Sequence, residues 1–571
     1  MDKKWLVPPG LSAEESSAIK AISAELKVPK LVAELLVRRG LKTETEIREF
    51  FHPDLSQLLD PFLFPDMEKA VKRIIQAIKA QELITIYGDY DVDGTTATAL
   101  LYLGLKRLGA IIDFYIPHRM IDGYGLSLGS LDQIKDSGSK LIISVDCGVN
   151  ALEEIKAIAD LGMEIIITDH HNPKDELPPA LAIINPKLPD CNYPFPHLAG
   201  VGVAYKLLMA IYQSMEIATN DNILKYMDLV AVGTIADIVP LVGENRIFAS
   251  IGLQHLIEKK NLGLNALIQL CGLNQKTLDT TDIVFGLAPR INAAGRMGSA
   301  AMAVQLLIST DEKNSAELAE IIERDNSLRQ QEDQKTYHEA CDIIDKKYKN
   351  LAQTPCIVIS SDDWHQGVIG IVASKLVEKY YRPVIMISFK DGFGSGSGRS
   401  VADFDLFAAL KHVEHNLHSF GGHKYAVGLT IYQEYIDRFE NELARYVSEH
   451  LKLDQIQPPL VIDHEIELYD ISAFLLNSIE RFAPFGPENL RPTLITKQVQ
   501  VANYPYNVGR NHLKLKVVKD GVYLDMIGYN LGDYLTLLKK NSVIDIVYTL
   551  EYNRFGNKTT IQGKLRDLRI H

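Results

Sequence analysis

The stretch Ile84–Leu101, ITIYGDYDVDGTTATALL, places three aspartates at alternate positions where one kind of secondary structure gives way to another. The β-branched run before them predicts a buried strand, and the Ala- and Leu-rich run after them predicts a helix. Asp89, Asp91 and Asp93 therefore lie on a strand-to-helix turn. In an open α/β sheet, a turn at the carboxyl end of a strand is where ligands bind.

The letters DYDVDG also match the start of an EF-hand calcium loop. That loop requires a preceding helix and a bidentate Glu at its twelfth position, which counted from Asp89 is Leu100. A solvated turn is a simpler alternative, since turns favour Asp and Gly. However, the three carboxylates repel one another and the turn contains no Lys or Arg, so a bound cation is the better interpretation.

Further short apolar strands follow, and they alternate with segments of helical periodicity: 111–117, 140–146, 164–169 and 181–186. This alternation predicts a mostly parallel sheet with helices on both faces. Residues 311–354 contain no Gly or Pro and predict one long polar helix between two domains. We expect five segments: small helices over 1–52, an α/β domain over 53–310, the bridging helix over 311–354, a second α/β domain over 355–453, and a small β-barrel of OB type over 454–571.

Composition indicates an ordinary globular chain, with 46% hydrophobic and 23% charged residues among 571. No apolar run reaches the roughly 18 residues of a membrane span, and the first residues do not resemble a signal peptide. The five cysteines are scattered, which argues against a disulfide framework and a zinc ribbon. We therefore expect a cytoplasmic protein.

The net charge of −13 is unevenly distributed, because residues 491–571 carry +7 and the remainder −20. In this basic tail aromatic residues interleave with cations, as on surfaces that bind single-stranded nucleic acid. The alternative is that about half of the aromatics fill a barrel core, since strand residues alternate between inside and outside. The aromatics are Tyr504, Tyr506, Tyr523, Tyr529, Tyr534, Tyr548, Tyr552 and Phe555.

Acids and histidines also end the later strands: Asp146 follows one, His170 and His171 follow the next, and Asp237 lies in an apolar helical segment. Taken singly, each has an ordinary explanation as a helix N-cap, a satisfied core group or a surface loop. Taken together, the strand-end residues emerge at one edge of a parallel sheet, where all seven side chains can converge. Carboxylate and imidazole ligands suit Mn²⁺ or Mg²⁺, and so many ligands suit two ions.

The segments GDYDVDG, VDCG, TDHH and GTIADIVPL resemble, in order and spacing, the motifs of the DHH phosphoesterase superfamily. The segments 287–297, 364–376, 396–400 and 420–429 resemble those of the RecJ family of single-strand-specific exonucleases, as does 51–71. The resemblance implies a DHH catalytic domain over 53–310 and a DHHA1-like domain over 355–453. It also implies that Asp91, Asp93, Asp146, His170 and Asp237 are the metal ligands, with Asp146 as the bridge.

The resemblance makes Asp89 either a ligand or a support for one, and it places His171 beside the metals and near the phosphate. Arginines can hold substrate phosphates bidentately. The candidates for substrate binding are Arg119, Arg290, Asn292, Arg296, Ser397, Arg399 and His423.

The Gly- and Ser-rich segment 392–400 offers backbone N–H groups that can cradle a phosphate, unless it is only a flexible hairpin. The resemblance implies that this region holds a 5′ end and that His423 faces the cleft, whereas His365 either joins the site or only caps the helix after it.

The resemblance implies a 5′→3′ exonuclease on single-stranded DNA that uses two Mn²⁺ or Mg²⁺ ions in repair and recombination, with a single-strand-binding protein and a helicase as partners. Two rivals remain: a phosphoesterase of short oligonucleotides or cyclic dinucleotides, and a non-catalytic replication scaffold.

Overall fold

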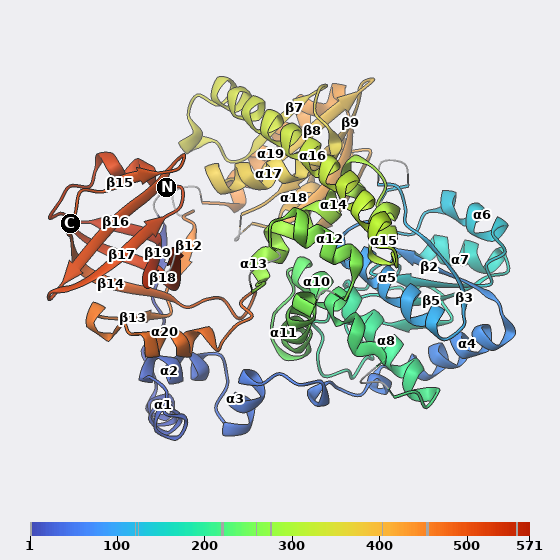
Figure 1. Ribbon diagram of the computed structural model, residues 1–571. Coiled ribbons are helices and arrows are strands. Elements are labelled where there is room, and N and C mark those ends of the chain that lie inside the picture. The colour runs from blue at the N-terminus through green and yellow to red at the C-terminus, as the bar shows by residue number, and fades with distance from the viewer. Residues whose placement is uncertain are drawn as a thin grey trace. The chain divides into compact units, whose positions relative to one another are not determined.

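The computed structural model describes residues 3–119, 122–123, 125–218, 222–258, 260–273, 277–401, 404–452, 456–555 and 558–571. The predicted boundary at 453–454 and the side chain of Phe555 lie outside what is described. The chain divides into two compact units. The first unit contains Lys3–Ala288, Leu307–Glu312 and Pro459–His571, and the second contains Pro289–Leu306 and Lys313–Pro458 (Figure 1).

The first unit contains a five-stranded sheet in which every strand is parallel to its neighbours. Its order is β3 (Ile111–Tyr115), β2 (Leu83–Gly88), β4 (Leu141–Val145), β5 (Glu164–Thr168) and β6 (Ala182–Ile184). Four of the five strands are short and largely buried runs rich in Ile, Leu and Val, as expected when helices cover both faces. The predicted parallel sheet is confirmed.

Helices pack on both faces of this sheet. One face packs against α6 (Leu128–Asp136) and α7 (Leu152–Asp160), whose buried Ile134, Ile155 and Ile158 share a core with Ile142 and Ile165 of the strands.

The other face packs against α5 (Val92–Arg107) and α8 (Gly200–Ser214), with α4 (Met67–Ala80) and α10 (Met227–Ala236) beside them. Both α5 and α10 are buried over almost their whole length, which fixes the ends that carry Asp91 and Asp237. The remaining helices of this domain are α11 (Gly243–Glu258), α12 (Leu262–Leu270) and α13 (Thr280–Asp282), followed by a π-helical turn at Ile283–Leu287.

The basic tail forms a seven-stranded sheet, drawn in orange to red in Figure 1, whose strands β14 and β16 also pair and close it into a barrel. The predicted OB-type barrel is confirmed. Its strands are β13 (His464–Glu465), β14 (Thr493–Val501), β15 (Tyr506–Val508), β16 (His512–Lys519), β17 (Val522–Gly528), β18 (Val543–Phe555) and β19 (Lys558–Ile570), with α20 (Ala473–Glu480) before β14.

The barrel buries only part of its aromatic set. Tyr548 is fully buried, whereas Tyr504, Tyr506, Tyr523 and Tyr529 are exposed. The interleaving of tyrosines with cations is therefore largely a surface feature, as the single-strand-binding interpretation requires.

The N-terminal helices share their core with the barrel. Buried residues of α1 (Ala13–Leu26) and α2 (Lys30–Arg38) lie in one apolar cluster with strands β14, β16 and β18, and α3 (Glu44–Phe51) adds Ile47. Strand β1 (Lys4–Leu6) pairs in parallel with β12 (Pro459–Val461). Neither association is indicated by any local pattern in the sequence.

The buried guanidinium of Arg246 on α11 ties three parts of the first unit together. It donates to the backbone carbonyls of Phe50, Phe482 and Ala483 at 2.8–2.9 Å and lies over the Phe50 ring. This fork links the end of α3 to the segment that leads into the barrel, where the Phe482 carbonyl also accepts from Asn489 Nδ2 at 2.8 Å.

The second unit contains the long helix α16 (Glu312–Lys347), which is the polar helix that the sequence predicts. Its sheet has the order β10 (Ser419–His423), β11 (Ala426–Tyr432), β9 (Phe393–Arg399), β8 (Val384–Lys390) and β7 (Ile357–Ser361). The helices are α14 (Ala288–Met297), α15 (Ala301–Leu307), α17 (Gln366–Tyr380), α18 (Leu406–His412) and α19 (Ile436–His450). In the described part of the chain, no helix combines the length and apolarity that crossing a membrane requires.

Candidate metal centre

The acids and histidines that the sequence places at strand ends meet at the carboxyl edge of the parallel sheet. Asp89 follows β2, Asp146 follows β4, and His170 follows β5. Asp91 is the N-cap of α5 and accepts from the Gly94 N–H at 3.0 Å, so the simple N-cap explanation holds for one of its oxygens.

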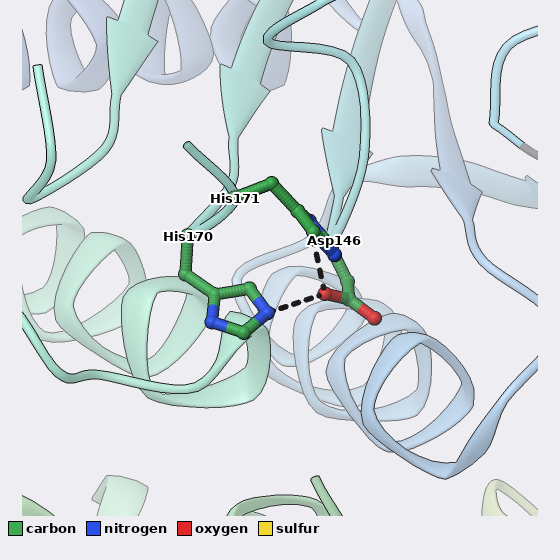
Figure 2. Close-up of side chains that lie close together, drawn as sticks. All are labelled: Asp146, His170 and His171. Carbon is green, nitrogen blue, oxygen red and sulfur yellow. Dashed lines mark ion pairs between the residues drawn. The ribbon is translucent and has the colours of Figure 1, made fainter. Parts of the chain in front are cut away.

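Distances confirm that these side chains converge. His170 Nε2 lies 3.1 Å from Asp146 Oδ1, 3.6 Å from Asp237 Oδ2 and 3.8 Å from Asp93 Oδ2. His171 Nδ1 lies 3.9 Å from the same Asp146 oxygen, as Figure 2 shows.

Three overlapping groups each have their ligand atoms within 4.8 Å of one another. Two of the groups share Asp146 and two share His170, which is the geometry expected of a bridged pair of sites. The groups are Asp89–Asp91–Asp146, Asp146–His170–His171 and Asp93–His170–Asp237.

The start of α8 holds two of the acids in place. Asp93 accepts from the backbone N–H groups of Gly200 at 2.6 Å and Val201 at 2.8 Å. A Cβ at Gly200 would lie 2.8 Å from Asp146 Oδ1, so only glycine allows this approach. The sequence analysis missed Gly200, because its effect depends on a contact between residues far apart in the chain.

The backbone at Asp146 is left-handed, with φ of 59°, and its N–H donates to the Thr168 carbonyl at 2.9 Å. A non-glycine residue in this region costs roughly 1–2 kcal/mol. The surrounding strands impose this conformation, which turns the carboxylate toward His170.

Asp169 orients the histidines and does not join the cluster. Its Oδ1 lies 2.8 Å from His171 Nδ1 and accepts from the His170 and His171 N–H groups, while its Oδ2 accepts from the Val149 N–H. Burial alone would raise the pKa of Asp169, but its contact with His171 lowers it, and the same contact raises the pKa of His171.

The cluster is electrostatically unfavourable without a cation. Burial, followed by the neighbouring carboxylates, raises the pKa of Asp93 to about 7 and that of Asp237 to about 9, and holds the pKa of Asp89 and Asp146 well above the ordinary value. Burial also lowers the pKa of His170 to about 3, so its imidazole is neutral and able to bind a metal.

Several buried ligand atoms have no hydrogen-bond partner: Asp89 Oδ1, Asp146 Oδ1, His170 Nε2 and Asp237 Oδ2. The 3.1 Å between Asp146 Oδ1 and His170 Nε2 is a close approach without hydrogen-bond geometry. Buried polar atoms left unpaired are costly. Oxygen and imidazole donors of this kind fit Mn²⁺ or Mg²⁺.

The carboxyl edge of the sheet also brings in Lys187, which the sequence analysis missed. The residue follows β6, and its N–H donates to Asn185 Oδ1 while Asn185 Nδ2 donates to the His171 carbonyl. Burial lowers the pKa of Lys187, and its charge in turn lowers the pKa of Asp237. The position of Lys187 shortly after the fifth strand of the sheet is the sequence signal that indicates it.

Arg119 lies near the cluster. Its guanidinium carbon is 5.0 Å from the centre of the ring of Tyr90, the residue between Asp89 and Asp91 in the sequence. The charge of Arg119 lowers the pKa of Asp89, against the larger effect of burial. Arg119, one of the predicted substrate-binding residues, therefore lies beside the sheet edge.

The other predicted substrate-binding residues belong to the second unit. Arg296 Nη1 donates to the Gly367 carbonyl at 3.0 Å, in the first turn of α17. Arg399 Nη1 donates to Ser397 Oγ at 3.0 Å, and both side chains lie against Gly370 of the same helix. Arg296, Ser397 and Arg399 thus gather around the start of α17.

The remaining predicted substrate-binding residues, and His365, are more dispersed in the second unit. Arg290 on α14 forms an ion pair with Glu323 of α16, and Asn292 follows it on α14, half-buried. His423 is exposed and pairs with Ala426, which pairs with Arg399, so the three lie in one row across β10, β11 and β9. His365 is the N-cap of α17, and its ring accepts from the Gly367 N–H.

The interpretation of 392–400 as a loop that cradles phosphate is wrong for most of its length. Residues Phe393–Arg399 form β9, a central strand paired with β8 on one side and β11 on the other. Its backbone N–H groups therefore belong to the sheet, and only its side chains remain to bind a phosphate. The glycines allow close packing: a Cβ at Gly396 would lie 2.8 Å from Leu429 Cδ1.

Comparisons with known proteins agree with this description. The model of the DHH family N-terminal domain matches residues 83–234, that of the DHHA1 domain matches 353–449, and that of the RecJ OB domain matches 462–567. Fold and site together define a DHH phosphoesterase with an added DHHA1 domain and OB barrel.

Two curated relatives are similar over nearly the whole chain. The single-stranded-DNA-specific exonuclease RecJ of Bacillus subtilis is 37% identical over 559 residues, which cover 97% of this chain and 70% of that protein. RecJ of Salmonella typhimurium is 32% identical over 585 residues, which cover 98% of each. The chain belongs to the RecJ family.

Solved structures of RecJ from Thermus thermophilus show the same fold. The complex with Mn²⁺ has a TM-score of 0.84 at 26% identity and covers 99% of this chain and 79% of that one. The complex with Mg²⁺ has a TM-score of 0.78 at 25% identity and covers 99% of this chain and 78% of that one. Both predicted metals therefore occur in structural neighbours.

The raised pKa of Asp237 has a measurable consequence in the metal-free protein. Since the folded state holds this proton more tightly than the unfolded state, stability falls as the pH rises from about 4 toward 9. In chelator, Asp237→Asn should therefore gain thermal stability over wild type as the pH is raised from about 5 to about 8, by at least about 2 °C. Added Mn²⁺ should reverse the order, because wild type gains more from binding.

The matched control is Asp228→Asn on the same helix. Burial raises the pKa of Asp228 to about 7, but none of the three ligand groups contains it. This variant should show a similar pH trend in chelator and an unchanged response to Mn²⁺. A wild-type response to Mn²⁺ in Asp237→Asn would remove Asp237 from the ligand set.

Proposed function

We propose that this chain is a single-stranded-DNA-specific exonuclease that hydrolyses phosphodiester bonds from 5′ to 3′ and acts in DNA repair and recombination. The observation that carries the proposal is the convergence of seven acids and histidines at the sheet edge, with unpaired buried ligand atoms. Membership of the RecJ family and the exposed tyrosines of the barrel support the substrate class.

We assign the metal ligands as Asp89, Asp91, Asp93, Asp146, His170 and Asp237, with Asp146 shared between two sites. When bound, two Mn²⁺ or Mg²⁺ ions supply a water ionised near neutral pH and positive charge opposite the phosphate oxygens. The chain contributes the geometry: α8 fixes Asp93, and the left-handed turn fixes Asp146.

We assign His171 to the substrate phosphate. Its Nδ1 is held 2.8 Å from Asp169, and its raised pKa favours a ring that donates hydrogen bonds. Arg119, beside Tyr90, is placed to hold a phosphate oxygen at the same edge.

We assign Arg290, Asn292, Arg296, Ser397, Arg399 and His423 to substrate binding by the second unit. The three around α17 combine guanidinium groups and a hydroxyl with a helix N-terminus, where anions are favoured. This is a suitable chemistry for a terminal phosphate.

We propose the domain limits 1–52, 53–310, 311–354, 355–453 and 454–571. The matched ranges 353–449 and 462–567 lie close to the last two of these domains, and the matched range 83–234 lies within the second. We propose that a single-strand-binding protein and a helicase are partners and that the protein is cytoplasmic. Cys147, Cys341 and Cys356 are buried thiols, which is consistent with a reducing compartment.

The proposed function is tested with Mn²⁺ and end-labelled single strands, each blocked in turn at one end. We expect mononucleotide products from strands with an open 5′ end and none from strands blocked there. Hydrolysis of only the shortest oligonucleotides or of cyclic dinucleotides would favour the first rival, and binding without hydrolysis would favour the scaffold.

Replacing the shared ligand should abolish the chemistry without unfolding the chain. Asp146→Ala removes an oxygen common to two ligand groups, so hydrolysis in excess Mn²⁺ should fall below a few per cent of wild type. Asp160→Ala, at the exposed end of α7, is the matched control and should keep full activity. Substantial activity in Asp146→Ala, with an intact thermal transition, would contradict the bridging role.

Arg399→Ala should weaken hydrolysis of strands with a 5′ phosphate more than strands with a 5′ hydroxyl. A charge-assisted hydrogen bond of roughly 1.5–3 kcal/mol corresponds to a loss of about ten- to a hundredfold in kcat/KM. Wild type and variant are each measured on one oligonucleotide in two forms, one with a 5′ phosphate and one with a 5′ hydroxyl. Equal losses on both would assign Arg399 to an internal phosphate or to the shape of β9.

The barrel is tested with point variants, because removing it would expose the core that it shares with α1 and α2. Arg510 and Arg554 are exposed cations of the barrel. Since each phosphate contact on a single strand contributes about −0.7 to the log–log salt slope, replacing both with Ala should make binding less salt-dependent. Lys79→Ala, at an exposed position on α4, is the control and should leave the slope unchanged. An unchanged slope in the double variant would show that Arg510 and Arg554 do not contact DNA.

A further inference from the structure

Ile238, the residue after the ligand Asp237, adopts a backbone conformation that isoleucine rarely adopts. Helix α10 ends at Ala236 with Asp237 as its C-cap, so Ile238 occupies the following position with φ of 60°. That position usually holds Gly and sometimes Asn. Of the non-glycine residues with positive φ in the described ranges, Ile238 alone is β-branched. A β-branched residue there is a genuine outlier.

The fold gains little from an isoleucine at this position. The residue is 53% exposed, so burial does not compensate for the left-handed backbone. The left-handed conformation of Asp146 is explained by its carboxylate, which is a ligand, but the side chain of Ile238 cannot bind a metal or a phosphate. A strained residue beside a reactive centre is reason to infer a function for its side chain.

The turn is anchored on its far side, which maintains the strain. The Leu241 N–H donates to the Pro487 carbonyl at 2.9 Å, and Asn245 Nδ2 donates to the Pro240 carbonyl at 3.0 Å. Leu241 itself is buried. The chain after Ile238 is therefore fixed, and the residue cannot relax by shifting the loop.

Ile238 lies where the metal centre opens to solvent. The side chains of Asp237 and His171 are 23% and 31% exposed, whereas those of Asp93 and Asp146 are buried. Ile238 follows Asp237 in the chain, so its Cα lies about 3.8 Å from that of a partly exposed member of the cluster. A substrate phosphate that reaches the ligands brings its adjoining sugar and base to this rim.

We propose that Ile238 contacts the base of the nucleotide next to the scissile phosphate and separates it from the neighbouring base. Isoleucine is among the apolar side chains that proteins insert between base steps. The proposal rests on the proposed function, since it requires a polynucleotide at the metal centre. It adds a substrate-contacting residue with no role in metal binding.

The test compares wild type, Ile238→Gly and Ile238→Asn on two versions of one single strand in Mn²⁺. The first version carries all its bases. The second is a series of strands that each lack one base, at a different nucleotide near the 5′ end. Wild type should lose about five- to thirtyfold in kcat/KM when the contacted base is absent, which is the lower part of the range for a base stacked on an aromatic side chain. Both variants should show this loss on the intact strand and no further loss on the abasic one.

Thermal unfolding provides the readout that a structural role would not give. Because Gly and Asn tolerate the left-handed region, both variants should match or exceed the thermal midpoint of wild type and keep its Mn²⁺-induced shift. Lys27→Gly is the matched control: Lys27 is an exposed C-cap with φ of 51° on α1. It should gain stability without any change in hydrolysis.

Equal losses by the variants on intact and abasic strands would overturn the inference. So would a lost Mn²⁺ shift, because it would mean that Ile238 acts through Asp237. Full activity of both variants on the intact strand would also overturn it. Absence of hydrolysis by wild type would instead count against the proposed function.

Discussion

The structure of the metal centre depends on the mutual repulsion of buried carboxylates. Asp89, Asp93, Asp146 and Asp237 are pressed together at the end of a sheet, and each has its pKa raised by burial and by its neighbours. Bringing them together costs free energy that the surrounding fold must supply. A bound cation converts this cost into affinity, which is why the ligand atoms can remain unpaired within the protein.

The supporting structure has the rigidity that this arrangement needs. The strands β2, β4 and β5 are covered on both faces, and α5, α8 and α10 pack tightly against one another. Backbone N–H groups of α8 and the carboxylate of Asp169 then fix Asp93 and His171 from outside the cluster. Positioning by packed elements of this kind is more exact than positioning by loops.

The two strained residues at the centre differ in an instructive way. At Asp146 the left-handed backbone directs a ligand, and the contact with Gly200 shows how closely the chain must pass. At Ile238 the same conformation occurs in an exposed apolar residue that directly follows Asp237. One strained turn is accounted for by the metals, whereas the other is better accounted for by the substrate.

The sequence by itself determined the parallel sheet, the long helix, the barrel and the strand-end acids and histidines that converge, because each depends on local periodicity or on a rule about strand ends. Asp89, Asp146 and His170 could be placed together without coordinates, since parallel strands put their carboxyl ends at one edge. The resemblance to a known family supplied the roles.

Only the tertiary structure decided what depends on contacts between distant residues. It showed that α1 and α2 share a core with the barrel, that Arg246 joins three segments, and that Gly200 lies against Asp146. It also placed 393–399 in the middle of a sheet, although a Gly- and Ser-rich run is locally typical of a loop. Glycine there serves close packing against Leu429, and the partner that requires it is more than thirty residues away in the sequence. Local patterns cannot specify such pairings, because the free energy that selects them comes from the folded core.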